Sequence, residues 1–345
     1  MKKTLFAGIV LSFLLIIQTN AQEKQYKVAC VAFYNLENLF DTIDQPEVDD
    51  AEFLPNGSYN WNSERYYYKL SHMSDVISKI GGELVKGGPI VIGFSEIENR
   101  SVVEDLTKQP ALLPGNYGIV HYDSPDRRGV DVALIYQQDH FKVLFSKSYR
   151  LTIPNKPDFL TRDQLLVSGL LDGELIHFIV NHWPSRRGGE KRSAPMRNAA
   201  ASLTRHIADS LLNADSTAKI IIMGDLNDDP VNNSLRKFLK AKGSVEETKA
   251  GDLFNPMYKL FRDGIGSLAY RDSWNLFDQM IISYPLLNDN TGLKFFKAKV
   301  FNQPFLAQKE GSFAGYPWRT YVGTNFMGGY SDHFPVYLFL IKEKK

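Results

Sequence analysis

The chain has 345 residues, with 40 lysines and arginines against 39 aspartates and glutamates, 43% hydrophobic residues and one cysteine. A single cysteine excludes an intramolecular disulfide framework, so stability must come from a hydrophobic core. A charge so close to zero excludes tight binding of long polyanions by bulk charge, although a local basic groove would still attract phosphate.

The first residues have the pattern of a secretory signal peptide. Lys2 and Lys3 precede an apolar run over residues 5–17, and a short polar stretch then ends at Ala21. An uncleaved anchor helix is the alternative, but this run of 13 residues is shorter than the roughly 17–25 that span a bilayer. We therefore expect cleavage after residue 21, export to the periplasm or the medium, and a mature chain without stable membrane insertion.

Short runs rich in Val, Ile, Phe and Tyr predict β-strands, in chain order, at 27–34, 89–94, 130–136, 141–145, 175–181, 219–223, 279–283 and 334–341. Apolar residues at helical spacing predict a helix at about 63–80 and another after Pro195. Cys30 alternates within the first strand, so we expect it to be a buried small hydrophobe and not a reactive thiol.

Strands mixed with helices predict an α/β architecture. No linker rich in proline, serine or glycine and no internal repeat interrupts the chain. We expect one domain over residues 22–345, although the length alone would also allow two. The long polar or aromatic stretches at 41–62, 244–272 and 288–329 are predicted to be loops, where specificity elements tend to lie.

The strongest single signal is the end of strand 219–223. Gly224 follows the strand, and Asp225, Asn227 and Asp228 come next. Asp225 and Asn227 are two residues apart, so in extended geometry both side chains point to one face. A carboxylate beside an amide suits a water that must be held and deprotonated near a phosphate. An acidic turn leading to a helix is the alternative interpretation.

Polar residues stand at the ends or starts of four other predicted strands, namely Asn35 with Glu37, Glu96, Asn181 with His182, and Asp332 with His333. Any one of these is equally consistent with a structural hydrogen bond. Together they predict one site to which several strands contribute. Oxygen ligands without a cluster of cysteine or histidine favour Mg²⁺, with Mn²⁺ or Ca²⁺ as alternatives, over structural Zn²⁺.

These segments also carry a family resemblance. In chain order, FYNLEN (33–38), SEIEN (95–99), RGVDVALIY (128–136), NHWPS (181–185), GDLNDDP (224–230), FDQMI (277–281) and SDHFPV (331–336) resemble the motifs of the endonuclease/exonuclease/phosphatase superfamily. The resemblance spans essentially the whole mature chain. It implies the DNase I-like fold, a four-layer α/β/β/α sandwich of two packed mixed sheets flanked by helices, with the site at one rim. It also implies hydrolysis of phosphoester bonds, and it is much less specific for the substrate.

The resemblance implies a metal-binding group. Glu96 is similar to the principal metal ligand of the family, and Asn35, Glu37 and Asp332 are similar to residues of the surrounding metal-and-phosphate shell. Family members differ in whether they use one metal or two.

The resemblance also implies catalytic roles. Asp225 is similar to the residue that orients or deprotonates the attacking water, assisted by Asn227. His333 is similar to the phosphate-binding or acid/base histidine, held by Asp278, and His182 to a second histidine that stabilises the transition state. Family members differ in which residue is the base.

Four residues near the motifs are predicted to contact substrate. Arg128 or Asp131 occupies the area where some family nucleases have a tyrosine or glutamate as a site partner. Trp183 stacks on substrate or closes the core. Arg186 belongs to a basic cluster that is either a phosphate clamp or a solvated helix start. Arg319 stands among aromatic residues that stack on rings or anchor a loop. Gln279 departs from the basic residue or histidine that often follows the aspartate in FDQMI, which predicts a weakened substrate contact.

Three functions are consistent with these features. The first is an exported nuclease, and the second is a phosphatase or phosphodiesterase acting on a small phosphoester such as a sugar phosphate or a phospholipid head group. The third, a non-catalytic binding protein on the same fold, is disfavoured because all the core groups are present. A flat basic groove would favour nucleic acid, and a closed aromatic pocket would favour a small substrate. No protein partner can be inferred.

Overall fold

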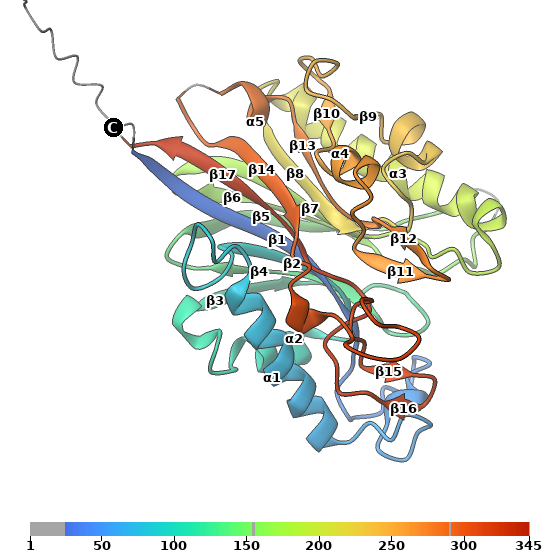
Figure 1. Ribbon diagram of the computed structural model, residues 1–345. Helices are drawn as coiled ribbons and strands as arrows, with labels where there is room; N and C mark the ends of the chain where they lie inside the picture. The colour runs from blue at the N-terminus through green and yellow to red at the C-terminus, as the bar shows by residue number, and fades with distance from the viewer. Residues whose placement is uncertain (1–24, 154–155, 290, 345) are drawn as a thin grey trace, which may run out of the picture.

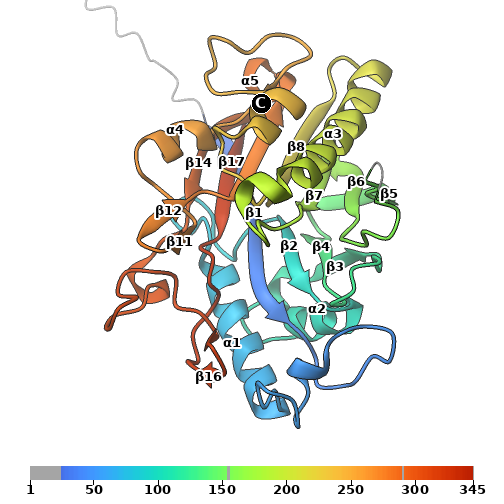
Figure 2. The same cartoon turned by 90° about the vertical axis from the view of Figure 1, so that its right-hand side faces the viewer.

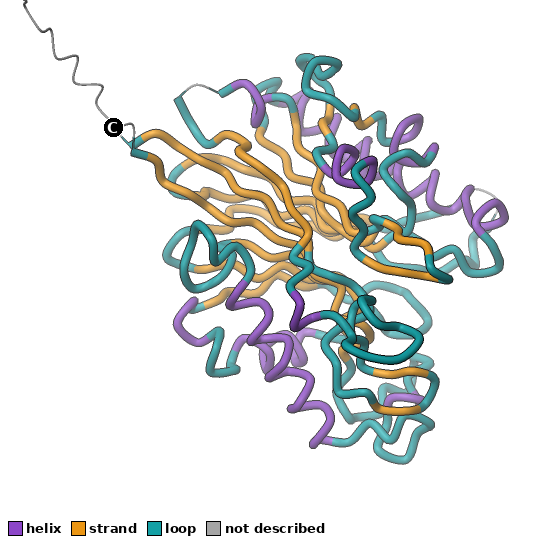
Figure 3. The backbone as a smooth tube through the Cα atoms, in the orientation of Figure 1, coloured by secondary structure: helices purple, strands orange, loops and turns teal. Residues whose placement is uncertain are grey.

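Two mixed β-sheets pack face to face, and helices cover the outer face of each (Figure 1; Figure 3). The computed structural model describes residues 25–153, 156–289 and 291–344. The predicted signal peptide, residues 1–21, lies outside the described residues. The layers confirm the four-layer α/β/β/α sandwich.

The first sheet has the strand order β14-β17-β1-β2-β4-β3. Only the β1–β2 pair is parallel. The strands are β1 (Tyr26–Leu39), β2 (Val91–Ile97), β3 (Tyr117–His121), β4 (Asp131–Gln137), β14 (Lys294–Val300) and β17 (Val336–Glu343). Helices α1 (Ser63–Lys79) and α2 (Arg100–Thr107) cover its outer face.

The second sheet has the strand order β5-β6-β7-β8-β13-β10-β9. Its strands are β5 (Phe141–Tyr149), β6 (Gln164–Leu171), β7 (Glu174–His182), β8 (Lys219–Asp225), β9 (Ala241–Lys242), β10 (Leu253–Phe254) and β13 (Asp278–Ser283). Helix α3 (Glu190–Ala214) packs on its outer face, on the opposite side of the sandwich from α1 and α2 (Figure 2).

Shorter elements connect the layers. They are the helices α4 (Met257–Arg262) and α5 (Pro285–Asn288) and the hairpins β11 (Leu268–Tyr270) with β12 (Ser273–Asn275) and β15 (Tyr321–Val322) with β16 (Asn325–Phe326). The stretches predicted to be loops contain regular structure, namely β10, α4, β11, β14 and the β15–β16 hairpin. Among the described residues, no helix is long and apolar enough to cross a bilayer.

The core explains why these elements stay together. One large apolar cluster lies between the sheets and beneath α1 and α2, and a second lies between the outer face of the second sheet and α3. Cys30 is fully buried in the first cluster, which confirms its prediction as a small hydrophobe.

Several predicted boundaries differ from the structure, and two of the differences lie beside predicted site residues. The first strand continues through Leu39 instead of ending at Tyr34, because the 35–39 segment still pairs with β2 across an irregular register. Helix α3 begins at Glu190, ahead of Pro195, because the Ser193 amide already donates a helical hydrogen bond to Gly189 O.

Candidate active site

Three site residues form one row across the second sheet. His182 ends β7, Asp225 ends β8 and Asp278 begins β13, and the register pairs His182 with Asp225 and Asp225 with Asp278. Residues paired in this way point to the same face of a sheet. The row therefore presents an imidazole and two carboxylates side by side, and all three residues are buried.

The first sheet contributes Glu96 through a distorted strand. The register of β2 against β4 shifts between Ser95 and Ile97, which leaves Glu96 as the additional residue of a bulge, with φ at 59°. Left-handed backbone costs a residue with a Cβ about 1–3 kcal/mol, and bulges beside active sites re-aim a side chain. The bulge turns the Glu96 carboxylate toward the facing sheet instead of leaving it in the alternation of the strand.

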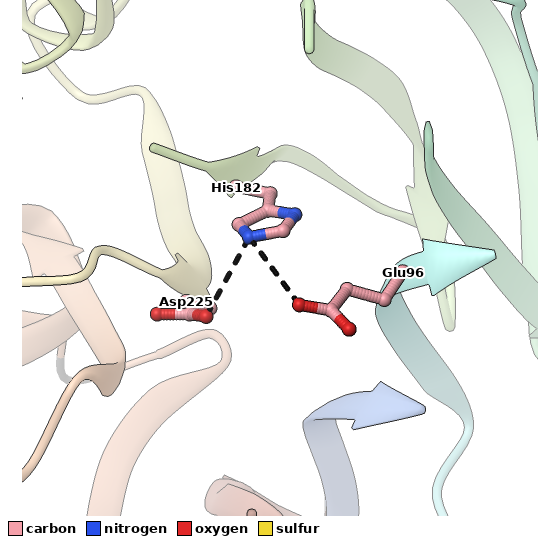
Figure 4. Close-up of side chains that lie close together, drawn as sticks. All are labelled: Glu96, His182 and Asp225. Atoms are coloured by element: carbon pink, nitrogen blue, oxygen red, sulfur yellow. Dashed lines mark ion pairs between the residues drawn. The ribbon is translucent and has the colours of Figure 1, made fainter. Parts of the chain in front are cut away.

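The two sheets meet at a group of three residues. His182 Nε2 lies 3.8 Å from Glu96 Oε1 and 3.7 Å from Asp225 Oδ2, between the two carboxylates (Figure 4). Asn35 of β1 donates from Nδ2 to Asp225 Oδ2 at 3.2 Å, and the Asn38 amide donates to Glu96 Oε2 at 3.0 Å. Residues from four strands thus converge on one small volume.

A histidine–carboxylate pair adjoins this group. His333 Nδ1 lies 2.6 Å from Asp278 Oδ2, and the Ser267 hydroxyl donates to the same oxygen at 2.5 Å. The Ser331 hydroxyl accepts from the His333 amide and donates to Asn35 O, which fixes the turn before β17. The structure therefore holds His333 by Asp278, as the resemblance implies.

Glu37 and Asp332 lie on the other side of the site, joined by Arg319. Arg319 Nη2 lies 2.6 Å from Asp332 Oδ2, and its Nε lies 3.4 Å from Glu37 Oε1. Glu37 Oε2 accepts from the Thr320 amide at 2.7 Å, and the buried Lys69 ammonium donates to Glu37 O. These carboxylates are engaged by protein donors and are not members of the Glu96–His182–Asp225 group, but Asp332 Oδ1 lies 3.9 Å from His333 Nε2.

The environment sets different protonation tendencies for the two histidines. Burial and the charges of Arg162 and Arg128 hold the pKa of His182 well below its ordinary range. Burial alone would also lower the pKa of His333, but the charge and hydrogen bond of Asp278 raise it well above that range. The environment therefore favours the neutral form of His182 and the protonated form of His333.

The pKa values of two carboxyl groups of the site are raised toward neutral pH. Burial raises the pKa of Asp225 to about 7 against the opposing charge of His333, with Asp278 adding to the rise. Burial and the charge of Asp332 raise the pKa of Glu37 to about 7, against Lys69 and Arg319.

The segment after β8 is anchored away from solvent. Asn227 has φ at 51°, its amide donates to Asp225 Oδ1, and its Nδ2 donates to Trp183 O at 3.0 Å. Gly224 fits here because a Cβ would collide with Asn181 O. Asn227 therefore holds the chain beside Asp225 and binds the end of β7.

Two residues predicted to contact substrate do not face the site. Trp183 is 1% exposed and packs in the cluster beneath α3, so it closes the core and offers no ring to a substrate. Gln279 is fully buried, its Oε1 accepts from Asn255 Nδ2 at 2.7 Å and its Nε2 donates to Asp228 O at 2.7 Å, so its replacement of a basic residue weakens no substrate contact.

The basic cluster after NHWPS divides between two environments. Arg186 donates to Asn227 O and forms ion pairs with Asp228 and Asp229. Acids of the loop after β8 therefore neutralise its charge. Arg197 is fully buried with Nε 2.8 Å from Asp228 Oδ1. The other three members, Arg187, Lys191 and Arg192, are exposed.

Arg128 and Arg319 both border the site. Arg128 is half-exposed near the His182 side, with its Nε 3.5 Å from Asp126 Oδ1. Arg319 is 43% exposed between a pocket of about 190 Å³ at Glu37 and one of about 520 Å³ at Asp332.

The sequence predictions omit several residues that shape the site. Lys69 and Ser267 bond to predicted site residues, and Arg162 reaches from the segment before β6 to donate to Trp183 O at 2.7 Å. Lys69 carried a signal, because it is a charged residue on the apolar stripe of α1 between Tyr66 and Met73.

A divalent cation fits the Glu96–His182–Asp225 group. His182 Nε2 lies 3.8 Å from Glu96 Oε1 and 3.7 Å from Asp225 Oδ2, which ligands about 2.0–2.1 Å from one ion can span, and all three donor atoms lie within 4.8 Å of one another. The separations of His182 from both carboxylates are too long for direct hydrogen bonds. Two carboxylates suit a hard cation.

Fold and site together define a phosphoester hydrolase of the DNase I-like class. Residues 30–342 match the model of the Endonuclease/Exonuclease/phosphatase family. The chain belongs to this family, whose members hydrolyse phosphoester bonds.

Solved structures share the fold at low sequence identity. An endonuclease/exonuclease/phosphatase family protein from Bacteroides thetaiotaomicron is 16% identical, with a TM-score of 0.57 over 93% of this chain and 100% of that one. TDP2 from D. rerio, solved with a single-strand DNA product, is 13% identical, with a TM-score of 0.54 over 91% and 98%. The mannosyl-6-phosphatase from Bacteroides thetaiotaomicron is 17% identical, with a TM-score of 0.53 over 90% and 99%. No curated protein has a significant sequence match to the chain.

Proposed function

We propose that the protein is an exported, Mg²⁺-dependent phosphodiesterase that cleaves nucleic acid by attack of water. The observation that carries the hydrolytic part is the meeting of Glu96, His182 and Asp225 beside the His333–Asp278 pair. Export rests on the pattern of residues 1–21, and Mg²⁺ on the oxygen-rich donor set.

Each of the site residues has its own role in the proposed reaction. Asp225, with a pKa raised by burial to about 7, accepts a proton from the attacking water near neutral pH. His333, kept protonated by Asp278, donates to a phosphate or leaving-group oxygen. Neutral His182 orients an oxygen of the phosphate, and Glu96 would hold the cation. When bound, the cation stabilises negative charge that develops on the phosphate.

A pocket beside Asp332 offers aromatic rings that suit a base of a nucleic acid as well as the ring of a small phosphoester. It has a volume of about 520 Å³, and its lining includes Tyr270, Phe313 and Tyr316 together with Arg319. Tyr270 is 62% exposed, so its ring is available to a ligand. Stacking of a base on an aromatic ring contributes about 1–3 kcal/mol without requiring a particular sequence.

The test is hydrolysis by the mature chain, residues 22–345, with and without EDTA. Plasmid DNA, RNA and a panel of small phosphoesters are assayed in parallel, using His333→Ala and Glu96→Gln. Exposed His206→Ala and Glu246→Gln serve as matched controls. We expect Mg²⁺-dependent cleavage of nucleic acid that both site variants abolish and both controls retain. Intact nucleic acid with turnover of a small ester would instead establish the phosphatase alternative, and unchanged turnover by both site variants would refute the site.

A further inference from the structure

A second pocket, of about 440 Å³, lies on the His182 side of the site. Four arginines from three separate segments line it, namely Arg127 and Arg128 before β4, Arg162 before β6 and Arg187 between β7 and α3. We call it the arginine pocket. Two aspartates, Asp126 and Asp158, also line it, so its arginines exceed its acids by two.

The acids neutralise only part of this charge. Asp126 accepts from Arg162 Nη1 at 2.9 Å and lies 3.5 Å from Arg128 Nε, so one carboxylate serves two guanidinium groups. Within the described residues, Arg127, Arg187 and Asp158 have no ion-pair partner. Arg127 and Arg187 are exposed and can turn toward a bound group.

Buried donors in the pocket wall lack partners. Arg162 is 6% exposed, and its Nε has no hydrogen-bond partner in the described chain. The neighbouring Thr161 hydroxyl, in a residue 1% exposed, also has none. Leaving a buried polar group unsatisfied costs about 1–3 kcal/mol, so a small movement of the pocket wall that brings either donor to a bound oxyanion would be favoured. Guanidinium groups match the oxygens of a phosphate in pairs.

The pocket shares a wall with the catalytic centre. Arg162 Nη2 donates to Trp183 O, one residue after His182, and the same carbonyl accepts from Asn227 Nδ2. Arg162 and Arg128 are also close enough to His182 to lower the pKa of that imidazole. An anion held in the pocket is therefore a neighbour of the phosphate at His182.

We propose that the arginine pocket binds a second phosphate of the substrate, adjacent to the one that is hydrolysed, and so selects substrates that carry two phosphates. The inference rests on the proposed function for the place of hydrolysis. The second phosphate is either the next phosphate of a polynucleotide or the distal phosphate of a small bisphosphate.

The first experiment compares substrates that differ by one phosphate. Dinucleotides with and without an additional terminal phosphate at either end form one arm, and sugar bisphosphates with the matching monophosphates form the other. The enzymes are wild type, the double variant Arg127→Gln/Arg187→Gln, and Arg262→Gln as an exposed control on α4. We expect the second phosphate to raise kcat/KM roughly tenfold in wild type and control, and the double variant to lose this preference while keeping kcat on single-phosphate substrates.

The two arms identify the source of the phosphate. A preference confined to dinucleotides assigns the pocket to a polynucleotide, and one confined to sugars assigns it to a small bisphosphate. A wild-type enzyme without preference in either arm, or a double variant that keeps it, overturns the proposal.

A binding measurement separates this proposal from the proposed function. Inorganic phosphate is titrated by calorimetry onto the full mature chain in EDTA. We expect the double variant to bind roughly tenfold more weakly than wild type and Arg262→Gln, whether or not any ester is hydrolysed. Equal binding by all three proteins overturns the pocket even if the enzyme proves to be a nuclease.

Discussion

Replacing Arg197 by methionine should destabilise the protein, because this arginine holds the loop after β8 from inside the core. Its side chain is fully buried, with Nε 2.8 Å from Asp228 Oδ1 and Nη1 donating to Ser193 Oγ at 2.8 Å. Methionine retains most of the packing volume and removes the charge. Removing one partner of a buried pair costs about 3–5 kcal/mol.

The lower end of that range applies here. Asp228 keeps a second cation, Arg186 Nη2 at 3.2 Å, and accepts from Ser234 Oγ at 2.7 Å. We therefore expect a loss of about 3 kcal/mol, which at about 2 °C per kcal/mol for a chain of this size lowers Tm by roughly 6 °C. Arg197→Met/Asp228→Asn should lose less than the sum of the single variants, because no charge is left unpaired.

Thermal and urea unfolding followed by circular dichroism measure these differences. Arg205→Met is the control on the same helix, since Arg205 pairs with Asp209, whose side chain is 42% exposed. Such a pair contributes about 0–1 kcal/mol. A loss of less than 1 kcal/mol in Arg197→Met, or equal losses in the two arginine variants, would refute the argument that burial makes this pair different.

Two further predictions concern the His333–Asp278 pair and the charge cluster of Lys219 with Glu174 and Asp289. Asp278→Asn should fold but lower kcat roughly 10²–10⁴-fold, because His333 loses the charge that keeps it protonated and oriented. An unchanged steady-state kcat would contradict this prediction. Lys219 lies 2.5 Å from Glu174 and 2.7 Å from Asp289, and it keeps the pKa of both carboxyls below their ordinary values despite the opposing effect of burial. This stabilisation is present above the pKa values of the two carboxyls in the unfolded chain, about 4.3 and 3.9, and is lost as pH falls through their pKa values in the folded protein. Lys219→Met should therefore be less stable than wild type at pH 7. The difference between their urea midpoints should shrink toward pH 3. A deficit independent of pH would show that the lysine acts through packing.

Strand ends were predictable because apolar runs followed by polar residues mark where a chain leaves the core. This pattern located His182 and Asp225, which the structure places in one row with Asp278. Periodicity could not show the bulge at Glu96, because a bulge depends on pairing with β4 and leaves the local composition unchanged. Nor could it show Arg162, which reaches Trp183 from a segment with no predicted element.

Missed strands have a different cause. Strand β6 is buried on both faces along most of its length, so it lacks the polar–apolar alternation that marks a half-buried strand. Strand β14 has exposed phenylalanine and lysine side chains at an edge of the first sheet, and its composition is close to that of a loop. In both strands the pairing partner, and not the local pattern, decides the structure.

The segment after β7 shows how one short stretch serves three environments. His182 points toward the first sheet, in the row that it forms with Asp225 and Asp278. Trp183 points into the core beneath α3. Arg186 and Arg187 are consecutive, yet the first neutralises the acids after β8 and the second lines the arginine pocket. A shift of this segment by one residue would place each side chain in its neighbour's environment. We infer that the burial of Trp183 in the core fixes the positions of the residues from His182 to Arg187. The buried tryptophan therefore positions both His182, the proposed catalytic histidine, and Arg187, the proposed phosphate contact.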